Sequence, residues 1–522
     1  MTWSKKHFYI FYAAIVAVYF LNFSGNAIWS THEAYYADAV RSMHETGILT
    51  EFYFNGEHRF QKPPMTYWLM YAGSSVFGVS EFGLRLPIVI LSLLSVFLVF
   101  KIGELLYGFK TGLFAMLIFS VSAQFAWLRN YASPEIPLTF FFTLGLYSYL
   151  RKEKRWKYLS FIAIGFAALT KGFPYIFLFF LIIIFERILK NGFRGIFKWI
   201  KSSYIIPGLV LTSLIGLSWP IWMSLKHGET FTSMFFSETI GRVVSHPNPM
   251  SLSDHLLFYP LSILWGFFPF SVILLAAVVH VFRHRNEVKE HGFILSWLMS
   301  FLLVFTASSG KLPVYLLQAY PALALLSASF LLKPMKKRYM GITVSGLVIP
   351  LFASVTGITA LIILFELSGL FLLLLPLPFI FLFLKISIND KLAIINFGSM
   401  LVALTIMFTG VMSKVEHYRP WNELRQVIQK IDPKTKIYAP DTFFDNLPYY
   451  SEKKVTKGIP QGEDGVVLSK AAELRGKVLW KGLIHSGGPE NHVFKFLRDC
   501  YKLSKGDSSK FDYYHLVQLE AL

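Results

Sequence analysis

The sequence has little charge and a single cysteine. Asp, Glu, Lys and Arg together make up 16% of its 522 residues, well below the roughly 25% of a typical soluble domain. One Cys in a chain of this length excludes an internal disulfide framework and argues against a thiolate metal site. Neither a G-x-G-x-x-G nor a Walker pattern occurs, so a nucleotide-binding loop of either kind is not expected.

Apolar residues are abundant instead. Hydrophobic residues make up 54% of the chain, and Phe alone occurs 52 times. Runs such as Ile88–Phe100 and Leu361–Leu384 carry almost no charge, and they lie in stretches close to the roughly 20 residues that a membrane-spanning helix needs. The pattern predicts a polytopic α-helical membrane protein with about thirteen spans, near residues 8–24, 84–107, 111–129, 135–150, 158–171, 173–187, 203–223, 256–282, 292–307, 312–332, 340–364, 367–386 and 391–412.

Positive charge has a consistent place in this pattern. The formal net charge is +19, which in a soluble protein would suggest nucleic acid as a partner. Lys5 and Lys6 precede the first span, which indicates a cytoplasmic N-terminus. The basic loops then fall on the same side, at 151–157, 187–201, 283–289 and 333–338. This agreement follows the positive-inside rule, so we interpret these loops as topology signals and expect membrane lipids, and no nucleic acid, as partners.

Three stretches do not fit into the membrane. Residues 25–83 and 224–255 form outer loops of a transmembrane domain that covers 1–412. An odd number of spans places the tail, residues 413–522, outside as well. This tail alternates strand-like runs (436–439, 465–468, 477–480 and 513–519) with helical ones (421–431 and 491–501). The tail is therefore predicted to be a small extracytoplasmic α/β domain.

Polar residues collect on the predicted outer face, many of them at helix ends. They are Thr31-His32-Glu33, Gln61-Lys62-Pro63-Pro64, Glu81 to Arg85, Glu135 after Pro134, Thr170-Lys171-Gly172, Glu238 with Arg242, and Lys311 with Tyr315. Carboxylates and cations gathered at one membrane face suit a phosphorylated lipid headgroup held by the cations, with a carboxylate nearby to take a proton.

The order of these motifs resembles a known family. The pattern H/D-E-x-Y/R-Y-A, then K-P-P-x-x-Y-W, E-F-x-x-R-L-P, L-T-K-G and K-L-x-x-Y-x-L is similar to the GT-C glycosyltransferases of the ArnT / protein mannosyltransferase type (glycosyltransferase family 39). By motif the resemblance covers roughly residues 1–330, and by architecture the whole chain.

The resemblance implies a transferase that moves a sugar from a polyprenyl-phosphate-sugar donor, with undecaprenyl phosphate as a candidate lipid carrier, to a lipid, glycan or protein acceptor, with inversion. It places the protein in the bacterial inner membrane with its active site facing the periplasm, where lipid A modification or protein glycosylation are candidate processes. By matching motif, the catalytic candidates are Glu33, Glu135 and His32, and the substrate-binding candidates are Lys62, Lys171, Arg242, Lys311 and Tyr315.

The sequence departs from the family pattern at several of these positions. His32 stands where an Asp is common, and Glu135 is one methylene longer than the usual Asp. Gln61 and Thr239 replace a Glu and a His found in the lipid A enzymes. The two replacements weaken the case for a metal site and for lipid A as the acceptor, so no metal ligand is assigned and a divalent ion stays an open alternative.

Other readings of the same residues stay open. Glu33 could cap a helix, Glu135 could begin one, Lys62 could mark an interfacial turn, and Arg242, Lys171 and Lys311 could snorkel at the interface. Arg85 is expected to pair with Glu81 on the same helix face, a structural role. At the level of function, the alternatives are a flippase for lipid-linked sugars, a surface polysaccharide polymerase or ligase, and an inactive GT-C relative that binds without transfer. Clean span centres argue against the flippase, because transporters place ionisable residues near the bilayer midplane.

Overall fold

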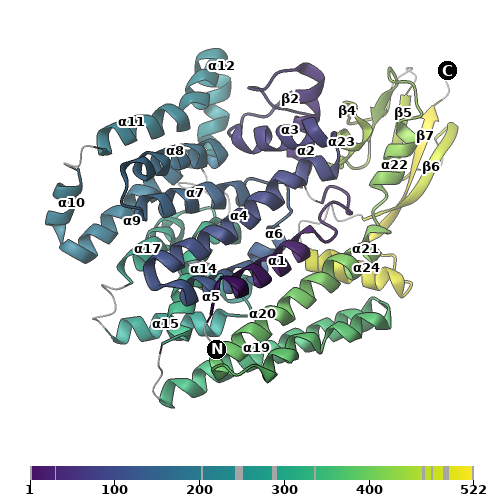
Figure 1. Cartoon of the computed structure of the whole chain (residues 1–522). Coiled ribbons are helices and arrows are strands. Elements are labelled where there is room, and N and C mark those ends of the chain that lie inside the picture. Colours follow the sequence, from purple (N-terminus) through teal and green to yellow (C-terminus); the bar gives the residue numbers. More distant parts are fainter. Residues whose placement is uncertain are drawn as a thin grey trace.

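The chain folds into a large helical body with a small strand-containing domain at its C-terminal side (Figure 1). The structure is a computed structural model that describes residues 3–29, 31–200, 204–241, 251–284, 291–333, 337–460, 465–471, 474–485 and 493–519. The helical body contains α1 (Lys5–Phe20), α4 (Glu81–Tyr107), α5 (Phe109–Val121), α6 (Ala123–Leu128), α7 (Glu135–Leu150), α8 (Lys154–Lys171), α9 (Pro174–Asn191), α10 (Phe193–Ile200), α11 (Ile205–Gly216), α12 (Ser218–Phe236), α14 (Leu252–Gly266), α15 (Ser271–Arg283), α17 (Gly292–Ala307), α18 (Tyr320–Leu331), α19 (Lys337–Leu364), α20 (Ile388–Ile406) and α21 (Met412–Glu416).

Several of these helices are apolar enough to cross a bilayer. Within the described residues, four segments meet length and composition criteria on their own: Glu81–Tyr107, Pro313–Leu331, Met340–Leu364 and Ile388–Glu416. Helices α11 and α12 meet them together, as a pair bent by 46°. Shorter apolar helices, such as α5, α15 and α17, pack around them. This composition fits a multi-spanning membrane protein.

Several predicted spans differ from the observed elements, among them 111–129, which is divided at Ser122 into α5 and α6. The stretch 256–282 is two helices, α14 and α15, separated around Pro269, which has no backbone N–H to donate. The stretch 203–223 is broken between α11 and α12. The stretch 367–386 is not α-helical but consists of two 3-10 segments, η3 (Gly369–Leu374) and η4 (Leu377–Phe383). Pro376 and Pro378 lie at their junction, where they interrupt the α-helical hydrogen-bond ladder.

Close helix packing in the body depends on small residues. Helices α4 and α5 follow each other directly and pack against one another. A Cβ added to Gly103 would lie 2.6 Å from the Cα of Gly112, so a side chain at this crossing would push the two helices apart. Small residues that let backbones approach are a usual means of packing helices in membranes, where burial from water gives little force.

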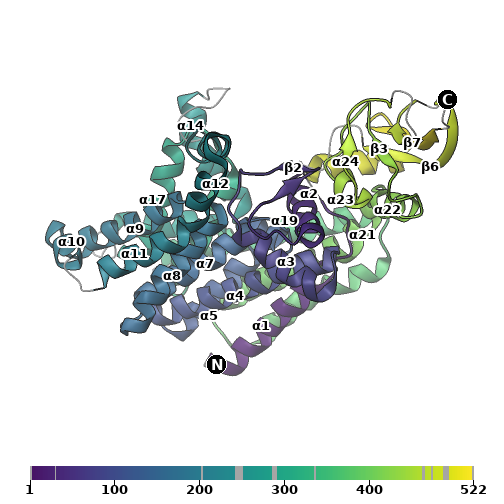
Figure 2. The same ribbon diagram turned by 90° about the horizontal axis from the view of Figure 1, so that it is seen from above.

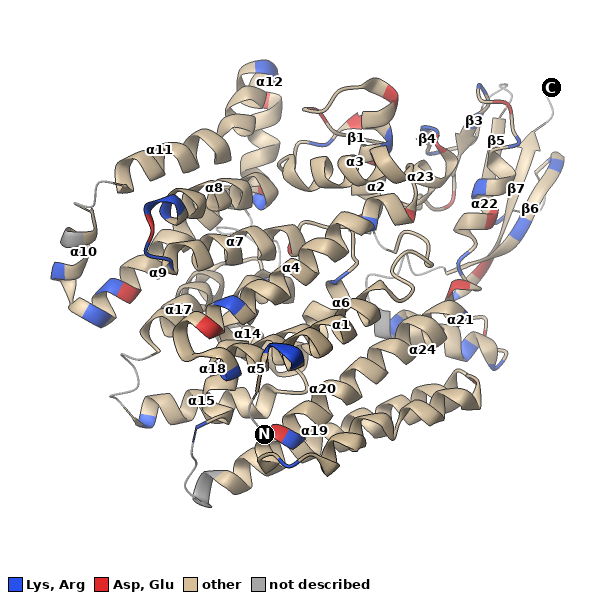
Figure 3. Cartoon of the chain, viewed as in Figure 1, with Lys and Arg blue, Asp and Glu red and all other residues tan. Residues whose placement is uncertain are grey.

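Part of the positive charge of the helical body lies at the end remote from the C-terminal domain. Figure 3 shows Lys and Arg on the α7–α8 connection and near the N-terminus of α1, at helix ends remote from the C-terminal domain. The arrangement agrees with the predicted grouping of the loop 151–157 and Lys5 on one side. The clusters at 285–289 and 334–336 lie outside the described residues.

The first outer loop is a folded layer rather than an irregular connection. It contains α2 (Thr31–Thr46), the short antiparallel strands β1 (Tyr53–Phe54) and β2 (Glu57–His58), and α3 (Met65–Phe77). Helix α3 packs on α4 and α2 packs on α3. In both views, this layer lies between the helical body and the C-terminal domain (Figures 1 and 2).

The C-terminal domain is α/β, as the sequence predicts. Its five-stranded sheet has the order β4-β3-β5-β7-β6, with β3 parallel to β4 and β5, and β7 antiparallel to β5 and β6. The strands are β3 (Lys436–Tyr438), β4 (Val455–Thr456), β5 (Gly465–Ser469), β6 (Gly476–His485) and β7 (Phe511–Leu519), and the helices are α22 (Trp421–Ile428), α23 (Leu447–Ser451) and α24 (Val493–Ser504). Helix α23 contacts α2, which joins this domain to the first outer loop.

Candidate active site

Glu33 and Arg85 form a buried ion pair at the start of α2. Arg85 Nε lies 2.7 Å from Glu33 Oε1, and Arg85 Nη2 lies 2.8 Å from Oε2. The backbone N–H groups of Trp29 and Ala132 donate to the same carboxylate at 2.6 and 3.0 Å. Four donors saturate the carboxylate. Glu33 was predicted as the catalytic carboxylate, and here its oxygens are engaged in holding α2 against α4 and the chain before α7.

The electrostatics of Glu33 agree with this arrangement. Burial would raise its pKa, but Arg85 and the hydrogen bonds outweigh burial and hold the pKa of the Glu33 carboxyl below its usual value. A pocket of about 30 Å³ adjoins the ion pair and is lined in part by Trp29, Trp127 and Tyr131. Since one water molecule needs about 10–15 Å³ by this measure, the pocket has room for water but not for a sugar.

The prediction for the ion-pair partner of Arg85 was wrong. The sequence suggested that Arg85 pairs with Glu81, one turn earlier on the same helix. Arg85 pairs with Glu33 instead, and Glu81 accepts a 2.7 Å hydrogen bond from the hydroxyl of Tyr450. The tertiary partner prevails because Glu33 and Arg85 are both buried, where a lone charge is far more costly than at the surface.

A second polar cluster lies beside the first turn of α2. We call it the outer cluster, and its members are His32, Arg59, Lys62, Glu135, Lys171 and Glu238. Glu135 begins α7, and Lys171 ends the neighbouring helix α8, so these helix ends bring the two side chains to a distance of 2.9 Å. The ammonium of Lys171 also lies 5.2 Å from the ring centre of Tyr315.

The cluster continues across the first outer loop. Lys62, between β2 and α3, forms an ion pair with Glu238 of the π-helix η1 (Ser237–Gly241). These two side chains are 17% and 14% exposed, so the ammonium can still be reached by a ligand. Arg242, predicted to bind substrate beside Glu238, lies outside the described residues.

His32 is the exposed member of this group. Its ring is close enough to Glu135, Arg59, Lys62 and Lys171 to interact electrostatically with all four. Partial loss of hydration lowers the pKa of His32; Glu135 raises it, and the three cations lower it further. The net direction is downward, so the imidazole is neutral at neutral pH and can accept a proton.

Arg59 was not predicted from the sequence. Its guanidinium lies 4.3 Å from the ring centre of Tyr35, and its Nε donates a 3.0 Å hydrogen bond to the hydroxyl of Tyr67. Stacking on an aromatic ring holds a guanidinium without neutralising it. The position of Arg59 three residues before Lys62 is a weak signal, because in an extended segment this spacing places the two side chains on opposite faces.

Lys311 and Tyr315 are not brought together in the same way. Lys311 Nζ donates to the carbonyl groups of Phe305 and Thr306 at 3.0 and 2.8 Å, near the C-terminal end of α17. A cation there satisfies carbonyls that have no helical partner. Tyr315 contacts Lys171 of the outer cluster, whereas the contacts of Lys311 are those of a helix cap.

The donor set of the outer cluster suits an anion better than a metal ion. No group of three or more His, Cys, Asp or Glu side chains among the described residues is arranged to hold a metal. Glu135 and Glu238 each face a lysine, and a nearby ammonium competes with a divalent cation for the carboxylate. Three cations, Arg59, Lys62 and Lys171, lie within electrostatic range of His32, and cations grouped in this way suit a phosphate.

Known proteins are similar to this chain in sequence and in architecture. The family model described as dolichyl-phosphate-mannose-protein mannosyltransferase matches residues 61–222. An uncharacterised protein of Aquifex aeolicus is 30% identical over 95% of this chain and 96% of its own length. ArnT of Cupriavidus metallidurans has a similar structure, with a TM-score of 0.74 at 18% identity over 91% of this chain and 96% of that one. The chain belongs to the GT-C glycosyltransferases of the ArnT / protein mannosyltransferase type.

This GT-C family includes relatives named for their reaction. An undecaprenyl phosphate-alpha-4-amino-4-deoxy-L-arabinose arabinosyl transferase of Proteus mirabilis is 26% identical over 62% of this chain. The match spans 59% of that enzyme's length. Another structure of Cupriavidus metallidurans ArnT, with a TM-score of 0.73 at 18% identity, covering 89% of this chain and 93% of that one, contains bound undecaprenyl phosphate. The GT-C membership predicted from the motifs is therefore confirmed, and the chain is a membrane glycosyltransferase.

Proposed function

We propose that this glycosyltransferase moves a sugar from a polyprenyl-phosphate donor to an acceptor on the outer face of the membrane. The acceptor is a hydroxyl or phosphate group of a lipid, a glycan or a protein. The observation that carries the proposal is that Arg59, Lys62 and Lys171 all lie within electrostatic range of His32. The named activity of the Proteus mirabilis relative and the undecaprenyl phosphate in Cupriavidus metallidurans ArnT supply the donor class.

The donor phosphate is proposed to bind between Lys62 and Lys171. Each lysine is paired with a carboxylate, Glu238 or Glu135, before the donor arrives. Phosphate oxygens accept charge-assisted hydrogen bonds from the same ammonium groups. These cations neutralise the charge that grows on the phosphate as the sugar leaves, and they do so most effectively in a site with little water.

His32 is proposed to take the proton of the acceptor. The acceptor oxygen attacks the anomeric carbon, and the bond from that carbon to the phosphate oxygen breaks, with its electron pair going to the phosphate. The acceptor proton moves to the neutral imidazole of His32, and Glu135 stabilises the imidazolium that results. Attack from the face opposite the phosphate inverts the anomeric carbon.

Glu33 is proposed to act through position. Its carboxylate is saturated by Arg85 and two backbone N–H groups. Transfer of the acceptor proton to this carboxylate would require one of these donors to leave. Its contribution is to fix the first turn of α2, and with it the direction of the His32 ring.

A transfer assay on the full chain tests the proposal. The purified protein is placed in liposomes with radiolabelled polyprenyl-phosphate sugars carrying mannose, aminoarabinose or galactosamine. Lipid A, polysaccharide and a secreted protein are offered as acceptors in parallel. We expect one donor to yield labelled acceptor and free polyprenyl phosphate in equal amounts. Movement of an intact donor across the bilayer would support a flippase instead, and donor binding without bond cleavage would support a scaffold.

A further inference from the structure

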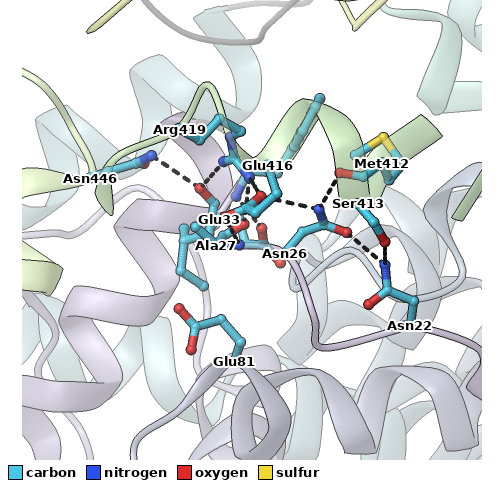
Figure 4. Close-up of polar contacts among 12 residues, drawn as sticks. Asn22, Asn26, Ala27, Glu33, Glu81, Met412, Ser413, Glu416, Arg419 and Asn446 are labelled. Atoms are coloured by element: carbon cyan, nitrogen blue, oxygen red, sulfur yellow. Dashed lines mark hydrogen bonds and ion pairs between the residues drawn. The ribbon is translucent and has the colours of Figure 1, made fainter. Parts of the chain in front are cut away.

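The end of α21 and the chain that follows it, at the start of the C-terminal domain, hold the segment that leads into the active site. Arg419 donates to the carbonyl groups of Ala27 and Ile28 at 3.1 and 2.7 Å, and Glu416 accepts a 2.9 Å hydrogen bond from the N–H of Ala27 (Figure 4). Arg419 is 4% exposed, so these bonds are shielded from water. Residues 27 and 28 lie a few positions before His32, and their backbone is thus fixed from outside the membrane domain.

Residues further along the C-terminal domain also bind this segment. Asn446 Nδ2 donates to the carbonyl of Ile28 at 3.0 Å, and the Tyr450 hydroxyl accepts from the N–H of Ile28 at 2.6 Å. Both side chains are buried. Buried hydrogen bonds of this kind are costly to break, because the donor and the acceptor would then be buried without any hydrogen-bond partner. The segment around Asn446 therefore has a fixed place beside α2.

Asp445, the residue before Asn446, faces the first turn of α2. Its carboxylate interacts with the hydroxyl groups of Thr31 and Tyr35 and is close enough to His32 and Arg59 to interact electrostatically with both. Asp445 is half-buried, and burial raises the pKa of its carboxyl. The carboxylate of Asp445 therefore lies beside the outer cluster, and the hydrogen bonds of Asn446 hold its segment there.

We infer that Asp445 is a substrate-binding residue that accepts a hydrogen bond from a hydroxyl or amino group of the sugar or of the acceptor. The inference rests on the proposed function. A carboxylate offers only acceptor atoms and repels a phosphate, whereas Lys62 and Lys171 attract it. The site is thus divided, with the phosphate at the lysines of the membrane domain and the polar, uncharged or amino-bearing part of the substrate at Asp445. On this account the C-terminal domain completes the active site.

The division predicts different effects on two ligands. Polyprenyl phosphate without a sugar should bind Lys62 and Lys171 and make no use of Asp445. Polyprenyl-phosphate sugar and the acceptor should use both regions. Asp445→Asn is therefore expected to leave the Kd of undecaprenyl phosphate within about twofold of wild type. The KM of the sugar donor or of the acceptor should rise by about 10- to 100-fold, the range for a hydrogen bond to a charged group.

Asp441 provides a matched control from the same segment. Its carboxylate accepts from the Ser469 hydroxyl and the Lys470 N–H at 2.6 and 2.7 Å, within the C-terminal domain. Asp441→Asn removes the same charge from the same stretch of chain without touching α2, and we expect unchanged KM values. Asp445→Glu keeps the charge and should recover part of the lost affinity, even if Asp445→Asn lowers stability.

The outcomes separate the inference from the proposed function. A wild-type chain that transfers no sugar from any donor would overturn both. An active wild type whose KM values are the same in Asp445→Asn would overturn the inference alone. Equal loss of undecaprenyl phosphate binding in Asp445→Asn and Asp445→Glu would also overturn it, because it would show a structural role. A selective rise in KM, partly reversed by Glu, supports it.

Discussion

Arg85 and Glu33 form a two-point ion pair, with Nε–Oε1 at 2.7 Å and Nη2–Oε2 at 2.8 Å, between α4 and the first turn of α2. Glu33 is fully buried, and Arg85 is 3% exposed. The pair joins the helical body to the outer layer at the point where His32 enters the active site. Its neighbour in sequence, His32, is exposed, so adjacent residues divide the tasks of anchoring and of meeting the substrate.

Removing one partner of this pair should destabilise the chain. Glu33→Gln removes the ion-pair partner of the buried Arg85 guanidinium, with Glu81 still within electrostatic range, and breaking a buried pair in this way costs about 3–5 kcal/mol. Thermal unfolding in detergent measures the loss, and activity should fall with it. Asp512→Asn removes an exposed partner of Lys470, where we expect an effect within about 0.5 kcal/mol. A Glu33→Gln variant as stable as wild type but inactive would contradict the positioning role.

The same pair should make stability depend on pH. The pKa of Glu33 is held below the value of 4.5 that it has when unfolded. Its stabilisation is therefore fully present above pH 4.5 and is lost as the pH falls through the folded pKa. Unfolding of wild type and Glu33→Gln, followed from pH 7 downward, should show a difference that narrows in acid. A constant difference across this range would be incompatible with the ion pair as its source.

The pH profile of transfer should report His32. Because its pKa is lowered from 6.5, the neutral base persists at neutral pH, and kcat/KM should fall only at pH values below 6.5. Glu135→Gln removes a charge that raises this pKa, so in this variant the fall of kcat/KM in acid should occur at still lower pH. His32→Gln should lower kcat by about 10²–10⁴-fold, and kcat/KM should no longer fall in acid because the titrating base is gone. If kcat/KM of His32→Gln falls in acid as it does in wild type, another residue takes the proton.

Lys62 and Lys311 should respond differently to the same substitution. Lys62→Ala removes a cation proposed to hold the donor phosphate, and the Kd of undecaprenyl phosphate should rise by about 10- to 100-fold. Lys311→Ala removes a cap from the end of α17, so it should lower stability slightly and leave this Kd unchanged. Isothermal titration or a spin-down binding assay measures both. Equal weakening by the two variants would argue against the division of roles.

Labelling of introduced cysteines tests the orientation of the chain. In a Cys500→Ala background, Arg155→Cys lies in the first turn of α8, next to the basic α7–α8 connection, and Lys477→Cys lies on strand β6. Both positions are exposed. A membrane-impermeant maleimide applied to intact cells should modify only the cysteine at position 477. Modification of the cysteine at 155 alone would reverse the topology and place the outer cluster in the cytoplasm.

The sequence predicted regular elements well where local chemistry decides them. The strands expected at 436–439, 465–468 and 513–519 correspond to β3, β5 and β7, and the helix at 135–150 begins at Glu135 as expected. The prediction of secondary structure failed where the sequence is almost uniformly apolar. The stretch 367–386 is apolar throughout, so periodicity gives no signal there. Only the prolines distinguish the 3-10 segments from a spanning helix.

The candidate site was predicted in part, for the same kind of reason. Motif order brought His32, Lys62, Glu135 and Lys171 to attention, and the structure places them in one cluster. The pairing of Arg85 with Glu33 joins residues far apart in sequence, and local spacing pointed to the wrong partner. Asp445 gave no signal at all, because nothing in its own segment shows that the C-terminal domain folds back onto α2.

Sugar transfer from a lipid phosphate is the central proposal for this chain, and a doubly labelled donor tests it most directly. The full chain in liposomes is given a polyprenyl-phosphate sugar labelled in both the sugar and the lipid, with an acceptor, and the products are separated by mass. We predict that sugar label appears on the acceptor while an equal amount of free polyprenyl phosphate accumulates, and that Lys62→Ala slows both together. Donor that remains intact with every sugar and acceptor tried, although it binds, would contradict this proposal.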